Sequence, residues 1–181
     1  MAAMGGSVSR RYAKAIFAIA VDKGNFELLG RQLSELAELW KDSPELRQTL
    51  ENPVFKLSQK RAVLQGLMPR VAPARPVQSL ALLLLERGRI ASLPAVALAY
   101  EEMCDDKLGR VRARVLSARP LDIASETEVR KALERRTGKK VIMTTVVDPA
   151  LISGVVAHVA GMVLDGSVAS RLSNLRHRLL N

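Results

Sequence analysis

The hydrophobic pattern of this chain changes its period near residue 105, and this change limits the possible folds more than any other feature. Before that point apolar residues recur every three or four positions, as in the leucine and tryptophan stripe of segment 29–40, which is typical of amphipathic helices. The segment RVRARVLS (residues 110–117) instead alternates strictly between arginine and small or apolar residues, which is typical of a half-buried strand. We therefore predict an N-terminal all-α domain over residues 1–105 and a small α+β domain over residues 106–181.

Short connections in the N-terminal part predict a compact antiparallel bundle of six helices. Ser43 followed by Pro44 indicates a helix start, Asn52-Pro53 indicates a helix end, and Ser58 is the expected cap of the fourth helix. The stretch PRVAPARP (residues 69–76) is expected to be a loop. The first, third, fourth and fifth helices are expected over about 9–22, 44–50, 58–67 and 77–87, the second starts near Asn25 and carries its stripe to Trp40, and the sixth starts near Ser92 and carries its stripe to Met103.

The C-terminal part predicts the order strand, helix, strand, hairpin, helix. Ser125 and Glu128 form a capping-box pattern for a helix that ends at Gly138. A strand rich in β-branched residues is expected over 140–148, and two short strands are expected around a turn at Ala160-Gly161. Ser167 is the expected cap of a last helix.

The first and fifth helices are more apolar than surface helices need to be, because a surface helix requires only one apolar stripe. The fifth helix is apolar around nearly its whole circumference between Val77 and Leu85. Two interpretations remain open from the residues alone. Either both helices are buried at the centre of the bundle, or their outer faces form a groove for an amphipathic helix of another protein.

The charge is uneven along the chain, which carries a formal net charge of +10. Residues 1–105 hold 14 basic and 11 acidic side chains, whereas residues 106–181 hold 14 basic and 7 acidic ones. The C-terminal part is therefore the one expected to bind an acidic protein, a nucleic acid or an anionic surface.

The sequence contains no phosphate-binding loop, no zinc-ligand spacing and no convincing catalytic set, so we predict no enzyme activity, no cofactor and no metal. Cys104 is the single cysteine, which excludes an internal disulfide and favours a reducing compartment. No apolar run approaches the roughly 20 residues that a membrane-spanning helix needs. A basic nucleic-acid-binding protein or a generic adaptor remains the alternative function. The former lacks stacking platforms, because residues 106–181 contain no Phe, Tyr or Trp.

Three segments resemble one known family. Asp148 to Leu180 (DPALISGVVAHVAGMVLDGSVASRLSNLRHRLL) is similar to the C-terminal motif of the ATP synthase delta subunit family, whose mitochondrial member is the oligomycin sensitivity-conferring protein. The opening RRYAKAIFAIAVDKG (residues 10–24) and NPVFKLSQKRAVL (residues 52–64) resemble the family's first and fourth helices. The chain departs from the family at Ser153, where a glycine is common, and at His158, where a charged residue is common.

The resemblance implies a stator subunit of the proton-translocating ATP synthase. Such a subunit binds the N-termini of the alpha subunits through its helical domain and the b-type peripheral stalk through its C-terminal domain. It resists rotational torque, binds no nucleic acid, has no membrane span of its own and lies at the cytoplasmic face of a bacterial inner membrane, or at an organellar energy-coupling membrane.

The resemblance also favours the groove interpretation. The residues expected to bind the alpha N-terminal helix are Tyr12, Ala15, Ile16, Ile19, Val77, Leu80, Ala81 and Leu84. Those expected to bind the stalk are Arg110, Arg112, Arg114, Arg171 and Arg176.

Overall fold

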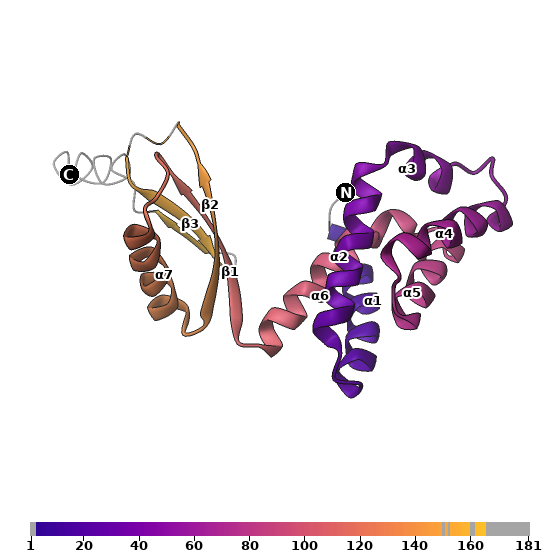
Figure 1. Cartoon of the computed structure of the whole chain (residues 1–181), viewed down its shortest axis with the longest axis horizontal. Coiled ribbons are helices and arrows are strands. Elements are labelled where there is room, and N and C mark those ends of the chain that lie inside the picture. Colours follow the sequence, from indigo (N-terminus) through magenta and orange to yellow (C-terminus); the bar gives the residue numbers. More distant parts are fainter. Residues whose placement is uncertain (1–2, 150, 152, 160–161, 166–181) are drawn as a thin grey trace. The chain divides into compact units, whose positions relative to one another are not determined.

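The computed structural model describes residues 3–149, 151, 153–159 and 162–165 of the chain. The chain divides into two units, Met1–Cys104 and Asp105–Asn181, and each has its own apolar core. The first unit is helical, and the second combines one described helix with a four-stranded sheet (Figure 1). The expectation of a helical N-terminal part and an α+β C-terminal part is therefore confirmed.

The N-terminal unit is built from helices whose apolar stripes meet in one core. Leu29, Leu33, Leu36 and Trp40 are buried, as their spacing predicts, and this stripe packs against the neighbouring helices. A short 3-10 turn, Ile90–Ser92, precedes the last helix. The helices are α1 (Ala3–Asp22), α2 (Phe26–Asp42), α3 (Pro44–Glu51), α4 (Leu57–Val71), α5 (Arg75–Glu86) and α6 (Leu93–Lys107).

Two details of α4 differ from the prediction. Its N-cap is Lys56 rather than Ser58, and the Lys56 backbone N–H donates to the Gln59 Oε1 at 2.9 Å. The helix also continues through Pro69, so the predicted loop is wrong at its beginning. Proline interrupts helical hydrogen bonding because it lacks an N–H, and α4 ends shortly afterwards at Ala72, which adopts a left-handed φ of 44°.

Three aromatic rings hold α1 against α2 and α6. The ring of Phe17 packs edge-on against Phe26 and Tyr100, with centroid distances of 6.1 and 5.5 Å. The Tyr100 hydroxyl donates to the Phe26 carbonyl oxygen at 2.9 Å, which satisfies the one polar atom of a fully buried side chain. Burial raises the pKa of Tyr100 well above its ordinary value, so this hydroxyl keeps its proton.

The C-terminal unit contains a sheet with the strand order β2-β1-β3-β4. β1 (Arg110–Ser117) pairs in parallel with β2 (Lys140–Val147) and antiparallel with β3 (Val155–Val159), which pairs antiparallel with β4 (Met162–Asp165). The helix α7 (Ile123–Thr137) connects β1 to β2 and packs its apolar side on one face of the sheet (Figure 1). β1 is thus an inner strand with a neighbour on each side.

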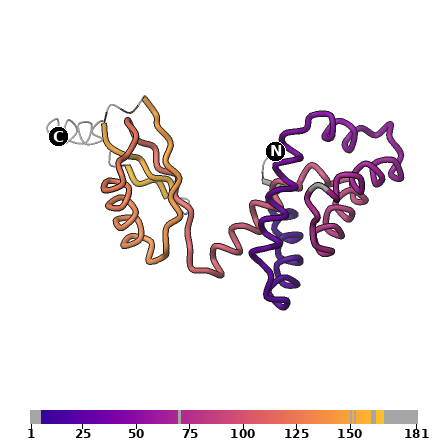
Figure 2. Tube along the Cα trace, in the orientation of Figure 1, coloured from indigo at the N-terminus to yellow at the C-terminus, as the bar shows by residue number. Residues whose placement is uncertain are grey.

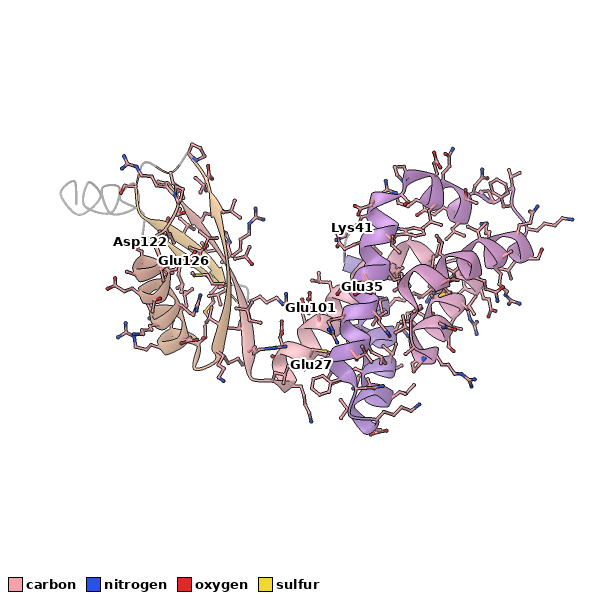
Figure 3. All side chains as sticks on the ribbon, in the orientation of Figure 1. Glu27, Glu35, Lys41, Glu101, Asp122 and Glu126 are labelled. Atoms are coloured by element: carbon pink, nitrogen blue, oxygen red, sulfur yellow. The ribbon has the colours of Figure 1, made fainter. Side chains whose placement is uncertain are left out.

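The helix α7 begins earlier than its capping-box pattern indicates. Its N-cap is Asp122, whose carboxylate accepts the Ser125 backbone N–H at 2.8 Å, so the predicted cap at Ser125 is wrong (Figure 3). Hydrogen bonding from Ser125, first through its side chain and second through its backbone N–H, lowers the pKa of Asp122. The helix ends as predicted at Gly138, with φ at 67°.

The trace of Figure 2 runs from the end of α6 into β1 through Leu108 and Gly109. The antiparallel pair of β3 and β4 matches the predicted hairpin strands. The predicted turn at Ala160-Gly161 and the predicted helix from Ser167 lie outside the described residues.

Candidate partner-binding surfaces

The α1 helix presents one apolar flank that the rest of the unit leaves partly uncovered. Its inner side, which includes Ala13 and Ile16, is buried in the core, and α1 packs against α5. At 100° per residue, Tyr12, Ala15 and Ile19 fall within one narrow sector beside this inner side. Tyr12 is half-buried, Ala15 is exposed and Ile19 is 46% exposed, so this flank can contact another molecule.

The four residues of α5 that the sequence predicted to line the groove are not on the surface. Val77, Leu80, Ala81 and Leu84 are all buried in the core of the N-terminal unit, where they are at most 7% exposed. The exposed apolar residue of α5 is Leu83, at 38%. Sequence reasoning missed Leu83 because α5 is apolar nearly all round, so periodicity alone could not separate its inner from its outer face.

A hollow lies between the start of α1 and the α6 helix. It has a volume of about 560 Å³, and Leu98 on its rim is 58% exposed. The Arg10 Nη2 lies 3.4 Å from the Glu102 Oε2 across it, which links the two helices. The lining is otherwise made of small residues. The lining residues are Gly6, Ser7, Ser9, Arg10, Ala95, Leu98, Ala99 and Glu102.

The arginine row of β1 is partly engaged within its own unit. Arg110 and Arg112 both contact Asp105, at the end of α6. The Asp105 Oδ1 lies 3.3 Å from the Arg110 Nη2. The Asp105 Oδ2 accepts a hydrogen bond from the Arg112 Nε at 2.6 Å. The Asp105 side chain is 8% exposed, so the arginines compensate a carboxylate that is nearly out of water. Arg110 and Arg112 therefore have a structural role.

Arg114 lies further along the same strand and is exposed. It pairs in register with His158 of β3 and Thr144 of β2, which lie on the same face of the sheet because side chains alternate along each strand. This is the face opposite α7, and it also carries Val163, which is 58% exposed. Arg171 and Arg176, the other two residues expected to bind the stalk, lie outside the described residues.

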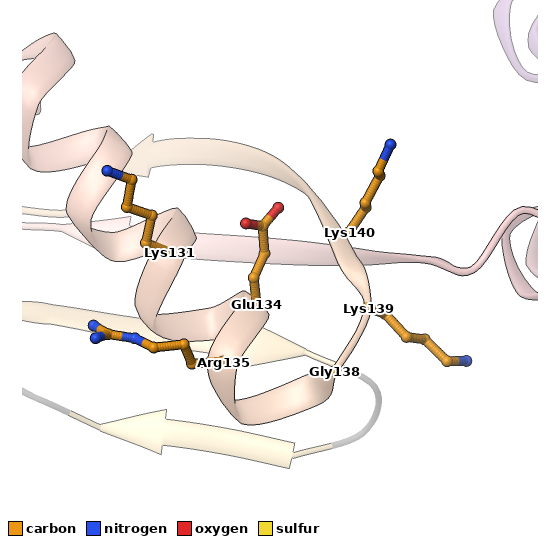
Figure 4. Close-up of a pocket in the computed structure, with 6 residues that line it drawn as sticks. All are labelled: Lys131, Glu134, Arg135, Gly138, Lys139 and Lys140. Atoms are coloured by element: carbon orange, nitrogen blue, oxygen red, sulfur yellow. The ribbon is translucent and has the colours of Figure 1, made fainter.

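Positive charge gathers at a third place, where α7 ends and β2 begins. An open cavity of about 520 Å³ is found there (Figure 4). The segment RKALERRTGKK (residues 130–140) supplies this charge. We call it the basic cavity, and its lining residues are Lys131, Glu134, Arg135, Gly138, Lys139 and Lys140.

Within the described ranges, no group of three or more His, Cys, Asp and Glu side chains is placed to hold a metal ion. No helix in the same part of the chain is both long and apolar enough to cross a bilayer.

Comparison with known proteins identifies similar sequences over nearly the full length. The profile of the family described as ATP synthase delta (OSCP) subunit matches residues 8–179. The ATP synthase subunit delta of Anaeromyxobacter dehalogenans strain 2CP-1 is 40% identical over 174 residues, which cover 96% of this chain and 97% of that protein. The ATP synthase subunit delta of Desulfatibacillum aliphaticivorans is 36% identical over 172 residues, which cover 95% of this chain and 94% of that protein.

The fold is also similar to that of a solved structure. A chain in the cryo-EM structure of the Toxoplasma gondii mitochondrial ATP synthase hexamer matches with a TM-score of 0.71 and 28% sequence identity. The match covers 96% of this chain and 97% of that chain, so it includes both units.

Proposed function

This chain belongs to the ATP synthase delta (OSCP) subunit family, and from this membership we propose that it is the stator subunit that links the alpha subunits of the catalytic head to the b-type peripheral stalk. As a member of the family it is a subunit of ATP synthase and takes part in ATP synthesis coupled to ion transport. The observation that carries the proposal is the full-length match, because both units are represented in relatives of the same name.

The proposed division of labour follows the two units. Residues 1–105 act as one six-helix bundle that binds the catalytic head, and residues 106–181 form the domain that binds the stalk. The protein itself is non-catalytic and requires no cofactor. It is bound peripherally at the cytoplasmic face of the energy-coupling membrane, held there by its partner subunits.

For the head, the proposed contact is an amphipathic helix from the N-terminus of an alpha subunit, bound along the exposed flank of α1. Tyr12, Ala15 and Ile19 would contact the helix directly, since they are at least partly exposed. Ile16 and the four buried residues of α5 would support this surface from below, since they form the adjoining core. The five residues of this supporting layer are Ile16, Val77, Leu80, Ala81 and Leu84.

For the stalk, the proposed contact is the C-terminal unit through its positive charge. Arg114 is the proposed contact on β1, because it is exposed and because Asp105 engages Arg110 and Arg112. Arg171 and Arg176 remain proposed contacts from the sequence. A stator with one contact at each end transmits torque from the head to the stalk without any chemical step.

The test is co-purification of the tagged full-length chain from its own cells. The proposed function requires alpha and b-type subunits to be retained with the chain. Retention of DNA or RNA in their place would identify a nucleic-acid-binding protein. Retention of neither would leave a generic adaptor, and both of these results would overturn the proposal.

A further inference from the structure

The basic cavity holds positive charge that the described part of the unit leaves unneutralised. Lys131 and Arg135 are one helical turn apart on α7, and Lys139 and Lys140 follow Gly138 into β2. Figure 4 shows the Lys131, Glu134 and Lys140 side chains extending to one side, with the Glu134 carboxylate between the other two. Four cations and one carboxylate therefore border one hollow of about 520 Å³.

The single carboxylate of the cavity already has a structural partner. Glu134 Oε1 accepts the Val141 backbone N–H at 3.1 Å, which fixes the beginning of β2 against the end of α7. Lys139 is engaged too, because its Nζ donates to Asp106 Oδ1 at 2.8 Å. Lys131, Arg135 and Lys140 make no ion pair with any residue that the structure describes. Their charges are the ones available to a ligand.

This arrangement contrasts with the arginine row of β1. There, Arg110 and Arg112 surround the carboxylate of Asp105, which lies within 3.3 Å of both. A partner that binds those two arginines must compete with an ion pair already formed. A partner that binds Lys131, Arg135 and Lys140 displaces no ion pair among the described residues, so binding there is less costly.

We propose that the basic cavity binds an acidic segment of a partner protein, with Lys131, Arg135 and Lys140 pairing with its carboxylates. The planar fork of Arg135 suits a bidentate carboxylate, and the two lysines add compact charges. A protein is favoured over a nucleic acid because residues 106–181 contain no aromatic side chain on which a base could stack. The inference rests on the proposed function, since it names a docking site on the unit assigned to the stalk.

The experiment compares two full-length variants with the same loss of charge. The cavity variant combines Lys131→Gln, Arg135→Gln and Lys140→Gln. The control variant combines Arg119→Gln, Arg130→Gln and Arg136→Gln, three exposed positions of the same unit that do not line the basic cavity. Fluorescence anisotropy measures binding of a labelled peptide of alternating glutamate and alanine, and of a single-stranded DNA of equal charge. Circular dichroism verifies that both variants remain folded.

The cavity variant is expected to bind the acidic peptide about tenfold more weakly than the wild type, with a shallower dependence on salt, whereas the control loses about twofold or less. Equal losses in both variants would show attraction by net charge alone and would overturn the proposal. Tighter binding of the DNA, weakened by the cavity variant, would overturn it in favour of a nucleic-acid site.

Co-purification separates this inference from the proposed function. Suppose that the wild type retains alpha and b-type subunits, but the cavity and control variants bind the acidic peptide equally well. The inference then fails and the stator function stands. If the cavity variant loses peptide binding but the wild type retains neither subunit, the proposed stator function fails and the acidic-segment site stands.

Discussion

The Nε of Arg112 lies 2.6 Å from the Oδ2 of Asp105, and this contact joins the last turn of α6 to the first half of β1. Asp105 is almost fully buried, whereas half of the Arg112 side chain is accessible to solvent. The arginine therefore balances a carboxylate that would otherwise be costly to bury. Part of the positive charge of the C-terminal unit thus stabilises its fold.

The substitution Asp105→Asn is expected to destabilise the C-terminal unit by about 1–2 kcal/mol, in the lower range for charged hydrogen bonds because Arg112 is half exposed. Urea unfolding followed by far-UV circular dichroism measures the loss. Trp40 fluorescence should report little change, since the single tryptophan is buried in the other unit. The control is Asp106→Asn, whose exposed pair with Lys139 should contribute much less. Equal effects of the two substitutions would contradict this interpretation.

The substitution Ala15→Asp is expected to weaken binding of an alpha N-terminal peptide by more than about tenfold, because it places a charge on the apolar flank of α1. The fold should persist, since Ala15 is exposed. Isothermal titration calorimetry measures the affinity. Ala95→Asp, which makes the same change in the hollow between α1 and α6, is the matched control. A loss with Ala95→Asp alone would place the docking site in that hollow instead.

The neighbouring leucines of α5 are expected to respond in opposite ways. Leu84→Ala should reduce the free energy of unfolding by about 2–5 kcal/mol, because the side chain is fully buried and its removal leaves a cavity. Leu83→Ala should change stability by less than about 1 kcal/mol, because Leu83 is 38% exposed. Urea unfolding monitored by Trp40 fluorescence checks both values. An unchanged free energy of unfolding in Leu84→Ala would show that this side of α5 does not form part of the core.

The substitution Asp122→Ala should lower the melting temperature of the C-terminal unit at neutral pH by removing the cap of α7. The hydrogen bond from Ser125 lowers the pKa of Asp122 in the folded state, so its stabilising effect is present above the ordinary value of 3.8. The effect is lost as the pH falls through the lowered pKa. Melting curves of both proteins should therefore converge under acid conditions, and a difference that stays constant with pH would exclude a role for the charged cap.

Arg114→Glu is expected to weaken binding of the soluble part of a b-type subunit without lowering the melting temperature, because Arg114 is exposed on the sheet face opposite α7. Arg112→Glu should reduce both properties, since it also removes one of the two arginines that engage Asp105. Pull-down at increasing salt, together with thermal melting, separates the two effects. Unchanged stalk binding in Arg114→Glu would remove this residue from the proposed contact.

The broad fold could be predicted because it depends on the spacing of apolar residues along each segment. The alternation in segment 110–117 specifies a strand, and the recurrence in segment 29–40 specifies a helix, whatever surrounds them. The helix N-caps were less predictable, since several polar residues near the start of a helix can act as the cap. Asp122 precedes Ser125 by one turn and captures its backbone N–H, which moves the beginning of α7.

The candidate surfaces could be predicted only in part, because they depend on which elements meet. An all-apolar helix such as α5 does not reveal that Leu83 faces outward while Leu84 faces inward. The engagement of Arg112 by Asp105 arises from the turn between α6 and β1, which periodicity does not describe. The cavity beside Lys131 likewise requires the end of α7 and the start of β2 to be placed together.

The inner position of β1 has a mechanical consequence. A pull transmitted along α6 enters the sheet through the one strand whose backbone is hydrogen-bonded to both β2 and β3. Tension along that strand loads its two ladders in shear, so many hydrogen bonds share the force instead of opening one after another. An edge strand at the same point would have only one ladder to resist the same pull, so a protein that must withstand repeated load is better served by this connection.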